Sequence, residues 1–133
     1  MNVGITFGTF DLLHIGHIHI LERSKALCDY LVVGISSDAL NVSKKQATPV
    51  YAQAERLKII SGLRVVDFVF LEESLELKRH YLQKYNANIL VMGDDWTGKF
   101  DFCSDLCRVI YLPRTPYVST TLVKAEVFSR QIG

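Results

Sequence analysis

The sequence predicts an α/β protein, with a single Rossmann-like domain over residues 1–133 and a five-stranded parallel sheet covered by helices on both faces. Five short apolar runs alternate with stretches of helical periodicity. This alternation is typical of parallel sheets with right-handed crossovers. The chain has 133 residues, of which 49% are hydrophobic and 22% charged, which suits one domain with an apolar core.

The elements follow in order along the chain. Strands are expected at residues 3–7, 30–36, 65–71, 88–93 and 108–112. Helical periodicity predicts four helices: from His17 onward, over residues 51–61, from a Ser74 cap to about Tyr85, and from a Ser119 or Thr120 cap through Val127. The polar segment 36–50 is expected to form a loop.

Composition excludes several function classes. The formal net charge is +1, so we expect no nucleic-acid or membrane partner, and any anion must be bound by local groups. No stretch approaches the ~20 apolar residues of a membrane span, and MNVGITFG lacks the features of a signal peptide. Three cysteines without a secretion signal predict reduced thiols in the cytoplasm.

Polar residues follow four of the five predicted strands. In parallel α/β sheets the carboxyl ends of the strands share one edge, and ligands bind there, where the strand order reverses. The four polar groups are residues 9–17, Lys44 with Lys45, Asp94 with Asp95, and residues 114–121. Their shared position predicts one binding site.

The first of these loops sets His14 and His17 three residues apart at the start of a helix. Gly8 is expected to let the backbone approach a ligand, and Gly16 to leave room for a phosphate between the histidines. Free N–H groups of the helix start would complete an anion site. The same spacing also fits half of a zinc site, which needs at least a third protein ligand, or two structural histidines.

The other loops offer groups of related chemistry, each with an ordinary alternative. Lys44 and Lys45 suit phosphate charge, although lysines on a polar loop are also typical of a solvated surface. Asp95 suits a basic side chain, a sugar hydroxyl or a magnesium hydration shell, or it forms a surface turn. The last loop combines a bidentate arginine with hydroxyls at a helix start, either to cap it or to bind phosphate, in Arg114, Ser119, Thr120 and Thr121.

Three segments, GTFDLLHIGHIHILERSKALCDYLVVGIS, VMGDDWTGKFDF and YLPRTPYVSTT, closely resemble the glycerol-3-phosphate cytidylyltransferases of the nucleotidyltransferase superfamily. The resemblance runs from Val3 to about Val127. It implies transfer of CMP from CTP to glycerol 3-phosphate, giving pyrophosphate and CDP-glycerol for teichoic acid or capsule synthesis. It also implies a cytoplasmic homodimer and Mg²⁺ as the counterion of CTP.

The resemblance assigns roles to the matched residues. The catalytic set is expected to be His14, His17, Lys45 and Arg114. The nucleotide-binding positions, which include the two glycines of the first loop, are expected to be Gly8, Thr9, Phe10, Gly16, Asp95, Ser119, Thr120 and Thr121. For the acceptor we expect Lys44 and Lys78, together with Arg64 near the start of the third strand.

The chain departs from the family pattern at Pro116 and Tyr117, where the family has Glu and Gly. Proline lacks an N–H donor, and tyrosine avoids backbone angles that glycine tolerates. A different phosphorylated acceptor, or transfer of AMP in place of CMP, therefore stays an alternative. A nucleotide-binding subunit with a decayed site and a zinc-binding module are further alternatives, and the intact His14, His17 and Arg114 argue against decay.

Overall fold

A computed structural model describes residues 1–45, 47–116 and 118–132, without the side chains of Lys45, Gln131 and Ile132. Its sheet has five parallel strands in the order β3-β2-β1-β4-β5. They are β1 (Val3–Gly8), β2 (Tyr30–Ser36), β3 (Phe68–Glu72), β4 (Ile89–Gly93) and β5 (Arg108–Leu112). The predicted parallel sheet is confirmed. Its third strand begins three residues late, because Val66 closes a turn on the carbonyl of Leu63.

The strand order places a crevice at one edge of the sheet. The chain builds outward from β1 to β2 and β3, and then returns to the other side of β1 for β4 and β5. Ile5 of β1 is therefore opposite Val32 of β2 on one side and Leu90 of β4 on the other. The connections diverge between β1 and β4, and a ligand crevice is expected beyond the carboxyl ends of these strands.

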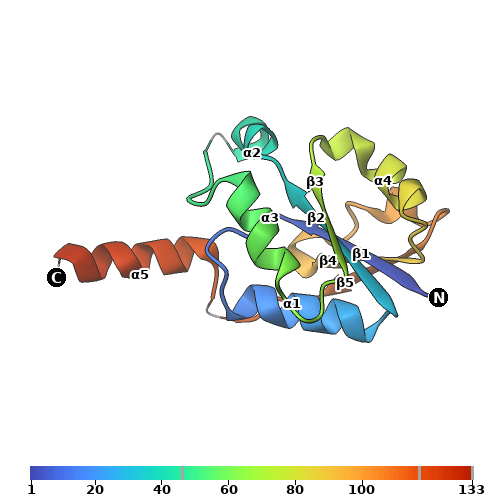
Figure 1. The fold of residues 1–133 in the computed structure, drawn as a ribbon, viewed down its shortest axis with the longest axis horizontal. Coiled ribbons are helices and arrows are strands. Elements are labelled where there is room, and N and C mark those ends of the chain that lie inside the picture. Colours follow the sequence, from blue (N-terminus) through green and yellow to red (C-terminus); the bar gives the residue numbers. More distant parts are fainter. Residues whose placement is uncertain (46, 117, 133) are drawn as a thin grey trace.

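Helices cover both faces of the sheet, as predicted (Figure 1). α1 (Ile15–Ala26) and α3 (Gln53–Ser61) pack on Leu31, Val33 and Ile35 of β2. Alternate residues of the same strands, such as Ile5 and Val32, face α4 (Lys78–Lys84) and the short η3 turn (Asp101–Cys103). Two further single turns are η1 (Leu75–Leu77), capped by Ser74 as predicted, and η2 (Asp94–Trp96).

The predicted loop 36–50 is wrong for residues Asp38–Lys45, which form helix α2. Arg56 of α3 is fully buried and fixes the start of this helix. Its guanidinium donates to Asp38 Oδ1 at 2.7 Å and to the Ser36 carbonyl at 2.7 Å. Leu40 and Asn41 of α2 are buried as well. The helix depends on partners distant in sequence, which its polar composition does not reveal.

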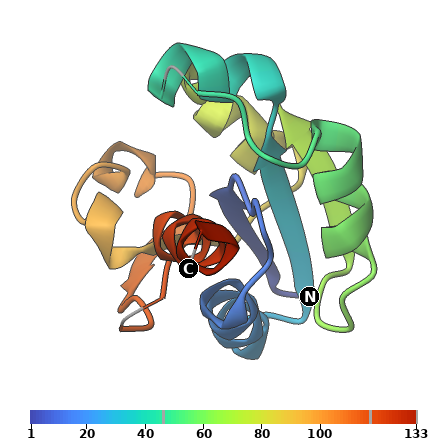
Figure 2. The same cartoon turned by 90° about the vertical axis from the view of Figure 1, so that its left-hand side faces the viewer.

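Helix α5 (Thr120–Ile132) begins at the crevice and extends away from the sheet (Figures 1 and 2). Ser119 caps it, since its Oγ accepts from Leu122 N at 3.1 Å, which confirms one of the two predicted caps. Leu122, Val127 and Phe128 are each more than half exposed along the helix. None of the helices in the described ranges is long and apolar enough to cross a membrane.

Candidate active site

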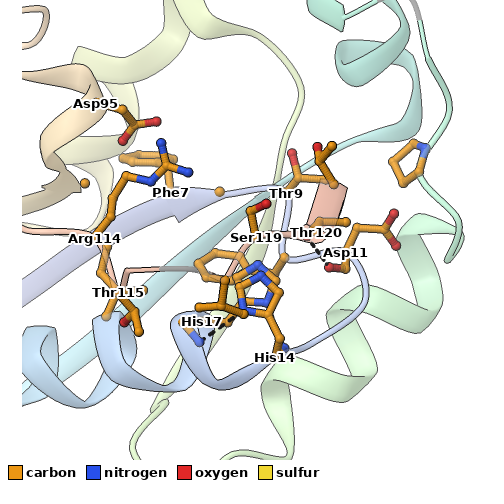
Figure 3. Close-up of a pocket in the computed structure, with 18 of the residues that line it drawn as sticks. Phe7, Thr9, Asp11, His14, His17, Asp95, Arg114, Thr115, Ser119 and Thr120 are labelled. Carbon is orange, nitrogen blue, oxygen red and sulfur yellow. Dashed lines mark hydrogen bonds between the residues drawn. The ribbon is translucent and has the colours of Figure 1, made fainter. Parts of the chain in front are cut away.

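A cavity of about 520 Å³ lies beyond the carboxyl ends of β1 and β4 (Figure 3). Its walls come from the β1–α1 loop, the segment after α2, the η2 turn and the segment between β5 and α5. Most of the predicted site residues line it, namely Gly8, Thr9, Phe10, His14, Gly16, His17, Asp95, Arg114, Ser119, Thr120 and Thr121. The fold thus brings together residues that are more than 100 positions apart in the sequence.

His14 and His17 form the start of α1. His14 Nδ1 accepts from Gly16 N at 3.0 Å, and His17 Nδ1 accepts from His14 N at 3.2 Å. The two rings stack, with centroids 3.8 Å apart and planes 21° apart, and Phe10 contacts His17 edge-on. Because each Nδ1 accepts a hydrogen bond, each neutral ring carries its proton on Nε2. Both side chains line the cavity and therefore offer it an N–H donor.

The environment keeps both rings neutral. Burial lowers the pKa of His14. Burial, and next the repulsion of His14, lower the pKa of His17 to about 4, while Asp11 opposes the shift. The histidines are therefore neutral donors near pH 7, and other groups must supply positive charge to the cavity.

The two glycines line the cavity and also lie against rings of the protein. A Cβ at Gly16 would lie 2.8 Å from His14 Cε1, and a Cβ at Gly8 would lie 2.8 Å from Phe10 Cε2. Each glycine therefore leaves room for a ring of the protein at the edge of the cavity. The helix start also has fewer free N–H groups than expected, because Gly16 N donates to His14 Nδ1, and His17 N donates to the His14 carbonyl.

Asp11 was not identified from the sequence, although it lines the cavity. Its buried carboxylate accepts from Val50 N at 2.7 Å and Tyr51 N at 2.9 Å. Its carbonyl accepts from Thr120 Oγ1 at 2.9 Å. Asp11 therefore joins the β1–α1 loop to the segment after α2 and to the start of α5. Its position two residues after Thr9, in a loop that ends a strand, was the available signal.

Asn41, also missed, lies in the segment read as a loop. Thr9 Oγ1 donates to Asn41 Oδ1 at 2.8 Å, and Asn41 Nδ2 donates to Ser36 Oγ at 3.0 Å. The Ser36 and Thr9 hydroxyls are 3.1 Å apart, and since the Thr9 proton points to Asn41, Ser36 donates in this contact. The three side chains form a closed ring of hydrogen bonds that fixes Thr9 and anchors α2 at the cavity.

Charged groups face the cavity from three sides. Arg114 and Asp95 both line the cavity, and Figure 3 shows them at the same edge of it as Phe7. Among the described residues, neither Arg114 nor Asp95 has a side-chain hydrogen bond or ion pair. Lys124, one turn into α5, also lines the cavity, with Nζ 4.0 Å from Asp11 Oδ2. A helix that begins at Thr120 presents its positive dipole end to the same space.

Several predicted residues do not line the cavity. Arg64 is exposed between α3 and β3, at the amino ends of the strands and away from this cavity, so its expected acceptor role stays a prediction. Lys78 is buried in an ion pair with Glu72 and lies over the Phe7 ring, 3.6 Å from its centroid. Burial lowers the pKa of the Lys78 amine, and Glu72 opposes this shift.

The roles expected for Lys44 and Lys45 of α2, and the effect of Tyr117, stay predictions. Lys44 is half-buried, three residues after Asn41, and is not a lining residue. The Lys45 side chain and Tyr117 lie outside the described residues. Pro116, the other departure from the family pattern, is exposed.

A zinc site at His14 and His17 would need a third protein ligand. Within the described ranges, no group of three or more His, Cys, Asp or Glu side chains is placed to hold a metal ion. Cys28, Cys103 and Cys107 are free thiols, and burial raises the pKa of each.

Comparisons with known proteins point to one family. The cytidylyltransferase-like family model matches residues 5–126. A glycerol-3-phosphate cytidylyltransferase of Bacillus subtilis is 50% identical, over 92% of this chain and 95% of that protein. One from Staphylococcus aureus is 41% identical, over 95% of both chains. A solved structure, the lipopolysaccharide core biosynthesis protein from Thermoplasma volcanium, superposes with a TM-score of 0.77 at 27% identity, covering 86% of this chain and 98% of that one.

Proposed function

The chain belongs to the cytidylyltransferase-like family, and we propose that it transfers CMP from CTP to glycerol 3-phosphate, giving CDP-glycerol and pyrophosphate. One observation carries the proposal. His14 and His17 both accept backbone N–H groups through Nδ1, so their Nε2–H donors remain for a ligand in a cavity that also holds Arg114, whose guanidinium pairs with no described side chain. This set of donors suits a bound triphosphate.

The reaction is an in-line displacement at the α-phosphorus. An oxygen of the glycerol 3-phosphate dianion attacks, and the bond to the pyrophosphate oxygen breaks. A phosphate monoester has a second pKa of about 6, so the attacking oxygen needs no strong base. The protein then has two tasks, which are to align the phosphates and to stabilise the charge that builds on their oxygens.

The residues of the site divide this work. The fixed Nε2–H groups of His14 and His17 donate to non-bridging oxygens and need no reorganisation during the reaction. Arg114 and Lys124 supply positive charge, and the start of α5 adds its dipole and the hydroxyls of its first turn. The lysines of α2 are proposed to meet the acceptor phosphate, since Asn41 anchors that helix at the cavity.

Magnesium is proposed as part of the CTP substrate. Mg²⁺ usually keeps several waters and is bound by substrate phosphates and one or two carboxylates. Asp95 is suited to its hydration shell, because this carboxylate lines the cavity and no described side chain pairs with it. The Asp11 carboxylate is already occupied by Val50 N and Tyr51 N.

We further propose a cytoplasmic homodimer that serves teichoic acid or capsule assembly. These proposals rest on the resemblance to the family. Light scattering on the purified protein measures the oligomeric state, and a mass of one chain contradicts the dimer.

The test of the activity is a pyrophosphate-release assay with magnesium. CTP, ATP, GTP and UTP are crossed with phosphorylated acceptors led by glycerol 3-phosphate, and the H17A variant serves as the control for contaminating activity. Turnover with CTP and glycerol 3-phosphate supports the proposal. Turnover of CTP only with another acceptor contradicts glycerol 3-phosphate as the acceptor. Turnover only with ATP contradicts CTP as the nucleotide. No turnover in the whole panel contradicts the proposed function.

A further inference from the structure

Two side chains of α1 contact the residues on either side of Arg114, one at a backbone carbonyl and one at a side-chain hydroxyl. His19 Nδ1 lies 3.0 Å from Thr115 Oγ1, within hydrogen-bond distance. Arg23 Nη1 donates to the Pro113 carbonyl at 2.9 Å. His19 and Arg23 are four residues apart, so they lie on one face of the helix. The residues before and after Arg114 are thus tied to the helix that also carries His17.

The side chain of Arg114 itself is available to a ligand. It is exposed in the cavity, and no described residue pairs with its guanidinium. Fixing the arginine side chain on a phosphate costs rotamer entropy, and a mobile backbone beneath it would add to that cost. The contacts at Pro113 and Thr115 remove the cost of fixing the backbone, while the N–H donors of the Arg114 guanidinium stay available.

We propose that His19 and Arg23 are positioning residues that hold the Arg114 backbone in place for the phosphates of CTP. This inference rests on the proposed function. His19 is not a lining residue of the cavity, so it acts through Thr115. The ties also fix the distance between Arg114 and the histidine donors, because α1 presents His17 at its first turn and His19 and Arg23 further along.

Arg23 has a competing role, because it lines the cavity and its charge is able to act on the triphosphate directly. The two roles differ in how they depend on Arg114. A residue that works through Arg114 loses its effect once Arg114 is removed, whereas a residue that contacts CTP keeps its effect. The test is therefore a mutant cycle in the presence and absence of the Arg114 side chain.

The experiment measures CTP binding by calorimetry, and kcat and KM for CTP by pyrophosphate release. The variants are H19A, R23M and their combination, each made in the natural chain and with R114A. E22A, an exposed neighbour on α1, is the matched control. We expect the H19A/R23M pair to weaken CTP binding about tenfold, which is 1.4 kcal/mol, with a smaller change in kcat. With R114A present, the same pair should cause no further loss. H19Q and R23K, which keep a hydrogen-bonding group, should recover most of the affinity.

Other results overturn the inference. An equal loss of affinity with and without R114A shows that Arg23 or His19 acts directly on CTP. If the natural chain binds and turns over CTP and H19A/R23M binds it equally well, the positioning role is overturned and the proposed function stands. Failure of the natural chain to bind CTP overturns the proposed function, and this inference with it. Urea unfolding of each variant separates a loss of affinity from a loss of fold.

Discussion

The imidazole of His14 lies stacked on that of His17, 3.8 Å between centroids, while its Nδ1 caps the N–H of Gly16. The His14 ring therefore caps the start of α1 through Nδ1 and offers its Nε2–H to the cavity. The same holds for His17, whose Nδ1 accepts from His14 N. Capping and ligand binding use different nitrogen atoms, so mutations can separate them.

The H14N substitution is expected to abolish most activity without a loss of stability. An asparagine oxygen can replace Nδ1 as the cap, and asparagine is among the best N-cap residues, but nothing replaces Nε2–H. We expect kcat to fall about 10²–10³-fold, as for the loss of one preorganised donor. H14A should lose the same activity and also about 1 kcal/mol of stability. Urea unfolding and pyrophosphate release measure both, and an active H14N would remove the ring from the mechanism.

Acid is expected to destabilise the protein through His17. Its pKa is lowered from 6.5 to about 4 in the folded state. Between these values the unfolded chain binds a proton that the folded protein does not, so stability falls as the pH is lowered from 6.5 towards 4, and this group contributes no change above pH 6.5. The slope for one proton is about 1.4 kcal/mol per pH unit.

The measurement for this prediction is urea unfolding at several pH values between 4 and 7. H17N serves as the comparison, because it lacks the titrating ring. The natural chain should lose stability more steeply than H17N over this interval. Parallel curves would show that His17 does not have a lowered pKa.

The G16A substitution should reduce activity far more than stability. Alanine is preferred to glycine within helices by about 1 kcal/mol, but here its Cβ would lie 2.8 Å from His14 Cε1. The His14 imidazole is the movable end of a side chain, so we expect it to shift and to displace its Nε2–H donor from the cavity. The matched control is G62A, whose Cβ would meet Ile59 O at an ordinary 3.5 Å. Full activity of G16A would contradict the role assigned to the His14 orientation.

Breaking the Lys78–Glu72 pair is expected to destabilise the fold. Both side chains are 2% exposed, so E72Q leaves a buried ammonium without its counter-charge, at a cost of about 3–5 kcal/mol. The E72Q/K78M double variant should recover part of this loss, because it removes both charges. Urea unfolding of the two variants checks the order, and a double variant less stable than E72Q would contradict it.

The same pair tests the acceptor role expected for Lys78. If the double variant folds and keeps its KM for glycerol 3-phosphate, Lys78 is a core residue. A selective rise of that KM, with CTP binding unchanged, would instead support contact between Lys78 and the acceptor.

Much of the fold was readable from local patterns. Strands 108–112 and 30–36 were apolar runs bounded by polar turns, and the structure has them at these bounds. Ser119 was readable as a cap because its hydroxyl needs only the helix that follows it. The approach of His14, Asp95 and Arg114 followed from the rule that parallel strands end at one edge.

Tertiary structure alone decided the rest. The sequence of residues 38–45 is polar, and it is helical because Arg56 and the Thr9–Ser36 pair supply partners from elsewhere in the chain. The roles of Gly8 and Gly16 depend on where two rings fold back, which spacing does not specify. The sequence alone was enough to predict that His14, His17, Asp95 and Arg114 reach the crevice, because strand ends are local, but it did not reveal Asp11 or Asn41. Which atoms of those groups remain free depends on the folded hydrogen bonds. Local bonds within the start of α1 occupy the two Nδ1 atoms, and long-range bonds from Val50 N and Tyr51 N occupy the Asp11 carboxylate.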